Sequence, residues 1–93
     1  MVVGVARVEL RMPENSSLKD KRRVVRSLLD RIRARFNVAA AEVEAQDRWD
    51  RAVLALVCVS NAAAHVDEML TRMINWLEAQ TDGGLVRVER EFR

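Results

Sequence analysis

The spacing between apolar residues changes in a fixed order along this chain, and that order limits the fold more than any other sequence feature. Over residues 2–12 apolar side chains recur at alternate positions, which is typical of a strand with one buried face. Over residues 18–36 they recur three and four positions apart, which is typical of an amphipathic helix. The same two patterns predict strands at 38–45, 51–59 and 85–92, and a second helix that follows Ser60 and Asn61 and stops at Gly83 and Gly84.

The element order is therefore β-α-β-β-α-β, the split β-α-β or ferredoxin-like arrangement of the α+β class. Right-handed crossovers would place both helices on one face of a four-stranded antiparallel sheet, with the first and third strands at its centre. No linker, low-complexity segment or repeat divides the sequence, so we expect one domain over residues 1–93. Ser16 and Ser17 are candidate N-caps of the first helix, and Asn37 is its candidate left-handed C-cap. Ser60 and Asn61 are candidate N-caps of the second helix, and Pro13 is expected to end the first strand.

The third strand is apolar on both faces. Residues 52, 54, 56 and 58 are apolar on one face, and the residues at odd positions are apolar on the other. A strand of this kind needs cover on both sides, whereas two helices on one side of the sheet cover only one. We therefore expect a homodimer that packs sheet against sheet. The candidate interface residues, which share the open face of the two central strands, are Val3, Val5, Val53, Ala55 and Val57.

The composition narrows the choice of cellular compartment for this protein. Hydrophobic residues make up 49% of the chain, which argues against disorder, yet no apolar run approaches the roughly 20 residues of a membrane-spanning helix. The first residues lack the basic leader and the cleavage site of a secretory signal. The single cysteine, Cys58, cannot form an internal disulfide or a multi-thiolate metal site. We expect a cytoplasmic protein that does not associate with membranes.

Positive charge is concentrated in the first predicted helix. Residues 16–36 hold eight basic and two acidic side chains, a net charge of +6, although the whole chain carries only +2. At 100° per residue, a stripe of cations about 20 Å long runs beside the apolar face. Several cations also crowd the helix N-terminus, where the helix dipole is already positive and acidic residues would be more stable. The candidate anion-binding residues are Lys19, Lys21, Arg22, Arg23, Arg26 and Arg33.

This charge has two interpretations. The backbone N–H groups and basic side chains could bind phosphate, with the stripe following a nucleic-acid backbone. Alternatively, long basic side chains could cover apolar surface and pair with the acidic remainder of the chain. No aromatic residue lies on the predicted central strands, so base stacking on the sheet face is not expected, and an RNA contact would be made by the helix.

No catalytic or metal-binding constellation can be named, and no cofactor is expected. Cys58 lies mid-strand between apolar neighbours, and no evident partner orients His65. Glu42 and Glu44 share a predicted strand face near Asp47 and Asp50, but their spacing matches no calcium loop. Pairing with a basic helix of another molecule is the more natural use of this acidic hairpin.

Short segments spread over essentially the whole chain form a recognisable series. They are Val3-Gly4, Ser17-Leu18-Lys19-Asp20-Lys21-Arg22, Phe36-Asn37-Val38, Ala41-Glu42, Asp47-Arg48-Trp49 and Val59-Ser60-Asn61. In this order and spacing they resemble the YlxP-like family of small bacterial proteins of unknown function, although Ala39-Ala40 and Glu44 depart mildly from the family pattern. The resemblance implies a ferredoxin-like fold and no established activity, and the genes of such proteins are often found among translation and ribosome-maturation genes.

The sequence thus favours a non-enzymatic binding protein whose first helix contacts RNA, the ribosome or another polyanion. The alternative is a structural or regulatory homo-oligomer that makes protein contacts through its open sheet face. An enzyme is the third hypothesis.

Overall fold

The fold was examined in a computed structural model that describes residues 1–12 and 17–93. Pro13 and Ser16, to which the sequence assigns a strand end and a cap, lie outside the described residues. The order is β-α-β-β-α-β, as predicted, and each predicted element is present to within two residues of its expected ends. The elements are β1 (Val2–Arg11), α1 (Leu18–Arg35), β2 (Ala39–Glu44), β3 (Arg51–Ser60), α2 (Ala63–Thr81) and β4 (Leu85–Phe92).

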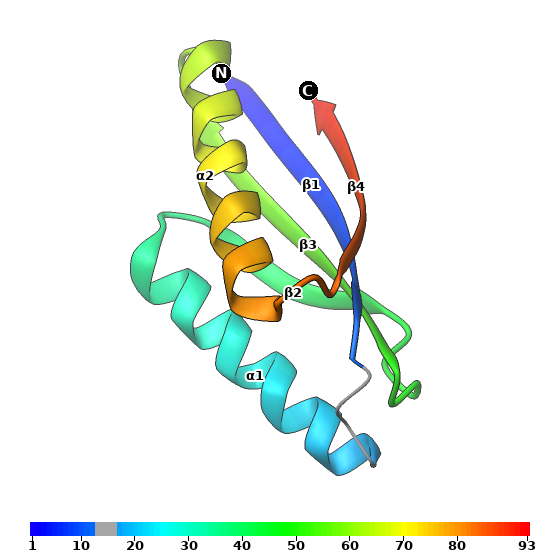
Figure 1. Cartoon of the computed structure of the whole chain (residues 1–93). Helices are drawn as coiled ribbons and strands as arrows, with labels where there is room; N and C mark the ends of the chain where they lie inside the picture. Colours follow the sequence, from blue (N-terminus) through cyan, green and yellow to red (C-terminus); the bar gives the residue numbers. More distant parts are fainter. Residues whose placement is uncertain (13–16) are drawn as a thin grey trace.

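The four strands form one antiparallel sheet in the order β2-β3-β1-β4, which confirms β1 and β3 as the central pair. These two strands pair along their whole length, from Val2 opposite Ser60 to Arg11 opposite Arg51. Figure 1 shows both helices on the same side of the sheet, which leaves the other side without a helix. The predicted ferredoxin-like α+β architecture is confirmed.

The hydrophobic core lies between the helices and the sheet. Alternate residues of β1 and β3 face it, and each helix contributes a buried stripe. Gly4 marks the closest approach of α2 to β1, because a Cβ built on it would lie 2.2 Å from Cγ1 of Val66. In the described part of the chain, no helix combines the length and the apolar content needed to cross a bilayer.

The helix ends agree only in part with the sequence. The hydroxyl of Ser17 caps α1 by accepting a hydrogen bond from the backbone N–H of Asp20 at 3.1 Å. The predicted caps of α2 are wrong, because its N-cap is Ala62, which offers no side-chain acceptor. Asn37 is not the expected left-handed cap of α1 either: the helix ends at Phe36 in extended backbone.

Two β-bulges decide which side chains reach the open face of the sheet. One lies in β2 between Glu42 and Glu44, and it turns these two carboxylates to opposite faces. The expectation that they share a face is therefore wrong. The other interrupts the β1–β4 pairing beside Glu9, where Val86 of β4 is left without a partner. Bulges re-aim side chains in this way because they add one residue to one strand only.

Candidate nucleic-acid interface

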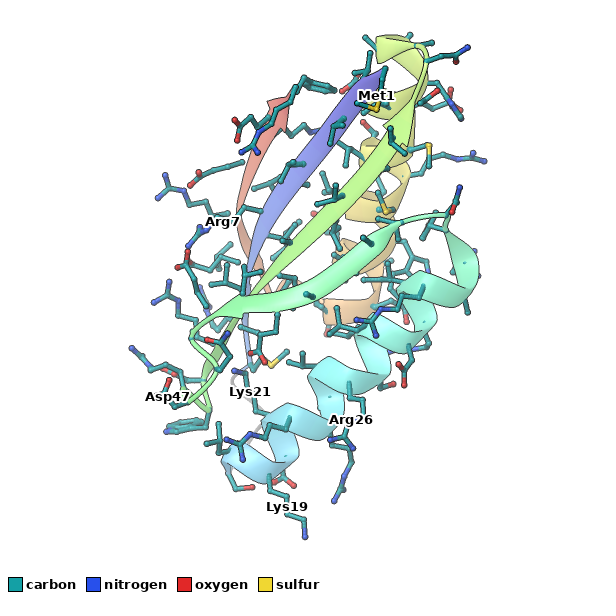
Figure 2. The ribbon with its side chains drawn as sticks, turned by 180° about the vertical axis from the view of Figure 1, so that it is seen from behind. Met1, Arg7, Lys19, Lys21, Arg26 and Asp47 are labelled. Carbon is teal, nitrogen blue, oxygen red and sulfur yellow. The ribbon has the colours of Figure 1, made fainter. Side chains whose placement is uncertain are left out.

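The basic residues of α1 do not all face the same way. Figure 2 shows Lys19 and Arg26 extending away from the protein, whereas Lys21 points toward the end of β2. Arg22, Arg23 and Arg26 are exposed, as is Lys19. Lys21 is 0% exposed, so its predicted role as an anion-binding residue is wrong.

Lys21 has a complete set of acceptors within the protein. Its Nζ donates to Oε2 of Glu42 at 2.5 Å, to the carbonyl of Ala45 at 2.7 Å and to that of Gln46 at 3.4 Å. Ala45 adopts a left-handed φ of 60°, which a non-glycine residue rarely does, where its carbonyl accepts this bond. A buried ammonium is tolerated only when it is paired and hydrogen-bonded in this way. Lys21 thus fastens the β2–β3 turn to the N-terminus of α1.

The remaining cations of α1 differ from the cations elsewhere. Among the described residues outside α1, all basic side chains except Arg11 form an ion pair with a carboxylate, namely Arg7, Arg48, Arg51, Arg72, Arg87, Arg90 and Arg93. On α1, only Lys21 and Arg33 do so within the described part of the chain. No ion pair or hydrogen bond to another described residue is made by the side chains of Lys19, Arg22, Arg23 or Arg26.

Three of the predicted residues line one groove between α1 and β2. Arg22, Arg26 and Arg33 surround it together with Glu42 of β2 and Gln46 of the β2–β3 turn, and its volume is about 350 Å³. The guanidinium of Arg33 donates from Nη2 to the carbonyl of Ala40 at 2.5 Å. Arg33 therefore covers part of the edge of β2, and its charge is only partly available to a ligand.

Ion pairs cross the open face of the sheet at one end. Arg7 of β1 reaches over β3 to Glu44 of β2, with Nη2 and Oε2 2.6 Å apart. Hydrogen bonding to this carboxylate raises the pKa of Arg7, and the same bond lowers the pKa of Glu44. Glu9 pairs with Arg51 at 2.7 Å on the same face.

These ion pairs change the expected oligomer interface. Val53 lies between Glu9 and Glu44 in the pairing register and is 0% exposed, so its assignment to an interface is wrong. Val3, Val5, Ala55 and Val57 are half-buried on the helix-free face. The most exposed apolar residue of β3 is one that the prediction left out, Val59, at 55%.

The acidic hairpin is used within the protein. Glu42 binds Lys21, Glu44 binds Arg7, and Asp50 binds Arg48 with Oδ2 and Nη2 2.9 Å apart. The hydrogen bond from Arg48 lowers the pKa of Asp50. Across the described ranges, no group of three or more His, Cys, Asp or Glu side chains could hold a metal ion.

The lone histidine and cysteine have local partners. The ring Nδ1 of His65 lies 3.0 Å from the hydroxyl of Ser60, a partner that the sequence did not reveal. Ser60 is the last residue of β3, and His65 lies in the first turn of α2. The hydroxyl of Ser60 also donates to Oδ1 of Asn61 and accepts from the backbone N–H of Ala62, both at 3.4 Å, and no described carboxylate is hydrogen-bonded to His65. Cys58 is buried, which raises its pKa and keeps it a thiol.

Comparison with known proteins gives the family of this chain. The family described as "Protein of unknown function (DUF503)" matches residues 3–90. The chain belongs to the DUF503 family. The chain is 30% identical to an uncharacterised protein YlxP of Bacillus subtilis (strain 168) over 78 residues, which cover 84% of this chain and 85% of that protein. The YlxP-like resemblance is thereby confirmed, and the family carries no assigned activity.

Proposed function

We propose that this DUF503 protein is a non-enzymatic, cytoplasmic binding protein whose helix α1 contacts the phosphate backbone of RNA, free or within the ribosome. The observation that carries the proposal is the contrast between cations. Those outside α1, with the exception of Arg11, are paired with carboxylates, whereas Lys19, Arg22, Arg23 and Arg26 are exposed and have no acidic partner among the described residues.

The energetics of this arrangement favour a ligand rather than stability. Like charges close together on a helix repel one another, and cations near a helix N-terminus also oppose the helix dipole. Binding of a phosphate backbone relieves both effects, and it releases the counterions that had condensed on the nucleic acid. Arginine suits this contact because its planar guanidinium can donate two parallel hydrogen bonds to one phosphate.

The groove between α1 and β2 extends the contact beyond the helix surface. Arg22 and Arg26 stand over it with Arg33, and the amide of Gln46 adds a neutral hydrogen-bonding group at one end. Contacts of this type fix the position of a nucleic-acid backbone on the protein, and they do not distinguish one base sequence from another. We therefore expect recognition of RNA shape and charge, and the resemblance to proteins encoded among translation genes directs the proposal to RNA.

The test compares two charge-matched double variants. Arg22→Gln with Arg26→Gln removes two charges from the groove, while Arg72→Gln with Arg87→Gln removes two from α2 and β4. The first variant is expected to bind a structured RNA at least about tenfold more weakly than the wild type, and the second to bind within about twofold. Equal losses in both variants would show that only net charge matters and would overturn the proposal.

A second candidate function is a homo-oligomer formed through the open sheet face. The observation that favours it is the exposure of Val59 beside half-buried Val3 and Val57 on a face that no helix covers. Charged residues, such as Arg7 paired with Glu44, border this apolar patch, which matches the apolar centre and polar rim of protein interfaces. Light scattering across micromolar concentrations tests it: a dimer that Val59→Asp dissociates supports it, and a monomer throughout excludes it.

A further inference from the structure

A second hollow lies at the same end of the protein as the N-terminus of α1. It encloses about 580 Å³ between the last residues of β1, the first residue of β3 and the bulged residue Val86 of β4. The β2–β3 turn closes one side of it with the indole of Trp49. Figure 2 shows Asp47 of this turn, Lys21 and Lys19 at one end of the molecule.

The two tryptophans have different surroundings. Trp76 of α2 packs edge-on against Phe36, with ring centroids 6.4 Å apart, and the guanidinium of Arg31 lies 5.4 Å from its ring centroid. Trp49 is 50% exposed, and no aromatic or cation partner holds it among the residues described. Val86, on the opposite side of the hollow, is also largely exposed. An indole left this open offers a flat apolar surface that favours a flat ligand.

Charged groups of both signs line the hollow. The carboxylates of Glu9 and Asp50 are paired with arginines, Arg51 and Arg48, so the cation left for a ligand is Arg11. Arg11, at the end of β1, is exposed and forms no ion pair with any described carboxylate. Arg51 binds Glu9 through Nη2 at 2.7 Å, but its Nε is buried with no hydrogen-bond partner. Within the described residues it is the one buried side-chain nitrogen or oxygen in that condition. Such an orphaned donor is rare in folded proteins, but this nitrogen is too buried for a ligand in the hollow to reach it.

The hollow and the groove of α1 share no lining residue, but the β2–β3 turn borders both of them. Gln46 lines the groove and Trp49 lines the hollow, and the two residues are three positions apart in this turn. The bonds from Lys21 to the carbonyls of Ala45 and Gln46 hold the turn against α1. A strand that follows the cations of α1 would cross this turn to reach the exposed indole of Trp49 and the side chain of Arg11.

We propose that this hollow is a stacking site for an unpaired nucleobase, with Trp49 as the platform and Arg11 as a contact to the adjoining phosphate. The inference deepens the proposed function, on which it rests, and it names single-stranded RNA as the ligand class. Stacking on an aromatic side chain needs no particular base, because every base presents a flat face. A protein that covers Trp49 is the competing occupant, and sedimentation of the Trp49→Ala protein distinguishes it from RNA.

Fluorescence of Trp49 provides a direct readout when Trp76 is replaced by Phe, because the chain has only two tryptophans. In the Trp76→Phe protein, titration with a single-stranded oligoadenylate is expected to quench the Trp49 emission. Inorganic polyphosphate is expected to displace the oligonucleotide from α1 and to leave the Trp49 emission of the free protein unchanged. Oligoadenylate that binds without altering the emission would overturn the stacking site.

Affinity measurements separate this inference from the proposed function. Trp49→Ala is expected to weaken binding of the oligoadenylate about tenfold, and to leave binding of polyphosphate unchanged. Unchanged oligoadenylate affinity in Trp49→Ala, together with loss in the Arg22→Gln, Arg26→Gln protein, would overturn stacking alone. Absence of any binding to either polyanion by the wild type would overturn both proposals. If Trp49→Ala abolished self-association in sedimentation and left RNA binding unchanged, the hollow would be a protein contact instead.

Discussion

Lys21 of α1 and Glu42 of β2 form a buried ion pair, with Nζ and Oε2 2.5 Å apart. The lysine is wholly inaccessible and the side chain of Glu42 is 16% exposed. This pair joins the basic helix to the edge strand, and it places the β2–β3 turn beside the exposed cations of α1. Lys21 thus holds in place the turn that borders the exposed cations of its own helix.

Replacement of Lys21 by Met is expected to destabilise the fold strongly. The change would leave the carboxylate of Glu42 and the carbonyl of Ala45 without their donor. Breaking a buried pair in this way costs about 3–5 kcal/mol of unfolding free energy. Urea unfolding monitored by circular dichroism measures the loss.

A double variant distinguishes the ion pair from simple packing. Adding Glu42→Leu to Lys21→Met removes the uncompensated charge, so the double variant is expected to be more stable than Lys21→Met alone. Wild-type stability in Lys21→Met would contradict the account of this residue. So would a double variant that is less stable than either single one.

Replacement of Gly4 by Ala is expected to push α2 away from β1. The new methyl group would lie 2.2 Å from Cγ1 of Val66, far inside a normal contact. Over-packing of a core costs about 1–3 kcal/mol of unfolding free energy. Thermal unfolding of Gly4→Ala measures the cost, and Val66→Ala in the same protein should return part of it. A Gly4→Ala protein as stable as the wild type would show that α2 is not packed so closely.

Most of the fold could be predicted because it follows from apolar spacing. The switch between periods of two and about 3.6 located each strand and helix, and the order of the elements then selected the sheet topology. The helix ends were less predictable. Ser60 and Asn61 have the residue types of N-caps, yet Ala62 occupies that position. The hydroxyl of Ser60 instead lies beside the ring of His65, a contact between side chains that periodicity does not report.

The candidate site could be predicted only in part. Lys21 precedes Val25 by four residues and Leu28 by seven, so the spacing already places it on the buried face of α1. The prediction gave more weight to the charge of Lys21 than to its position on the helix. The carboxylate that compensates this charge, that of Glu42, lies on another element. Val53 was misassigned for a related reason, because the β2 bulge that brings Glu44 onto its face leaves no mark in the apolar pattern.

Stability is expected to fall in acid partly through Glu44. The hydrogen bond with Arg7 lowers the pKa of Glu44 from its ordinary value of 4.5, so the unfolded chain binds this proton more readily than the folded protein. The stabilisation is therefore present above about pH 4.5 and is lost as the pH falls through the folded value. Asp50, whose pKa Arg48 lowers from 3.8, acts in the same direction at lower pH.

The Glu44→Gln variant isolates this contribution. It is expected to be less stable than the wild type at pH 7, and the difference should shrink as the pH is lowered toward 3. Both side chains are exposed, so 0.5 M salt should reduce the difference at pH 7 as well. A difference that stays constant between pH 7 and pH 3 would contradict an ionic role for the pair.

The salt dependence of RNA binding tests the central claim most directly. Binding of a structured RNA to the wild type, measured between 50 and 200 mM KCl, should give a linear fall of log K with log salt and a slope of about −3 to −4, as expected if four exposed cations of α1 contact phosphates. The Arg22→Gln, Arg26→Gln protein should show a slope smaller by about 2, and the Arg72→Gln, Arg87→Gln control should keep the wild-type slope. A wild-type slope near zero, or the same reduction in the control, would contradict phosphate binding by α1.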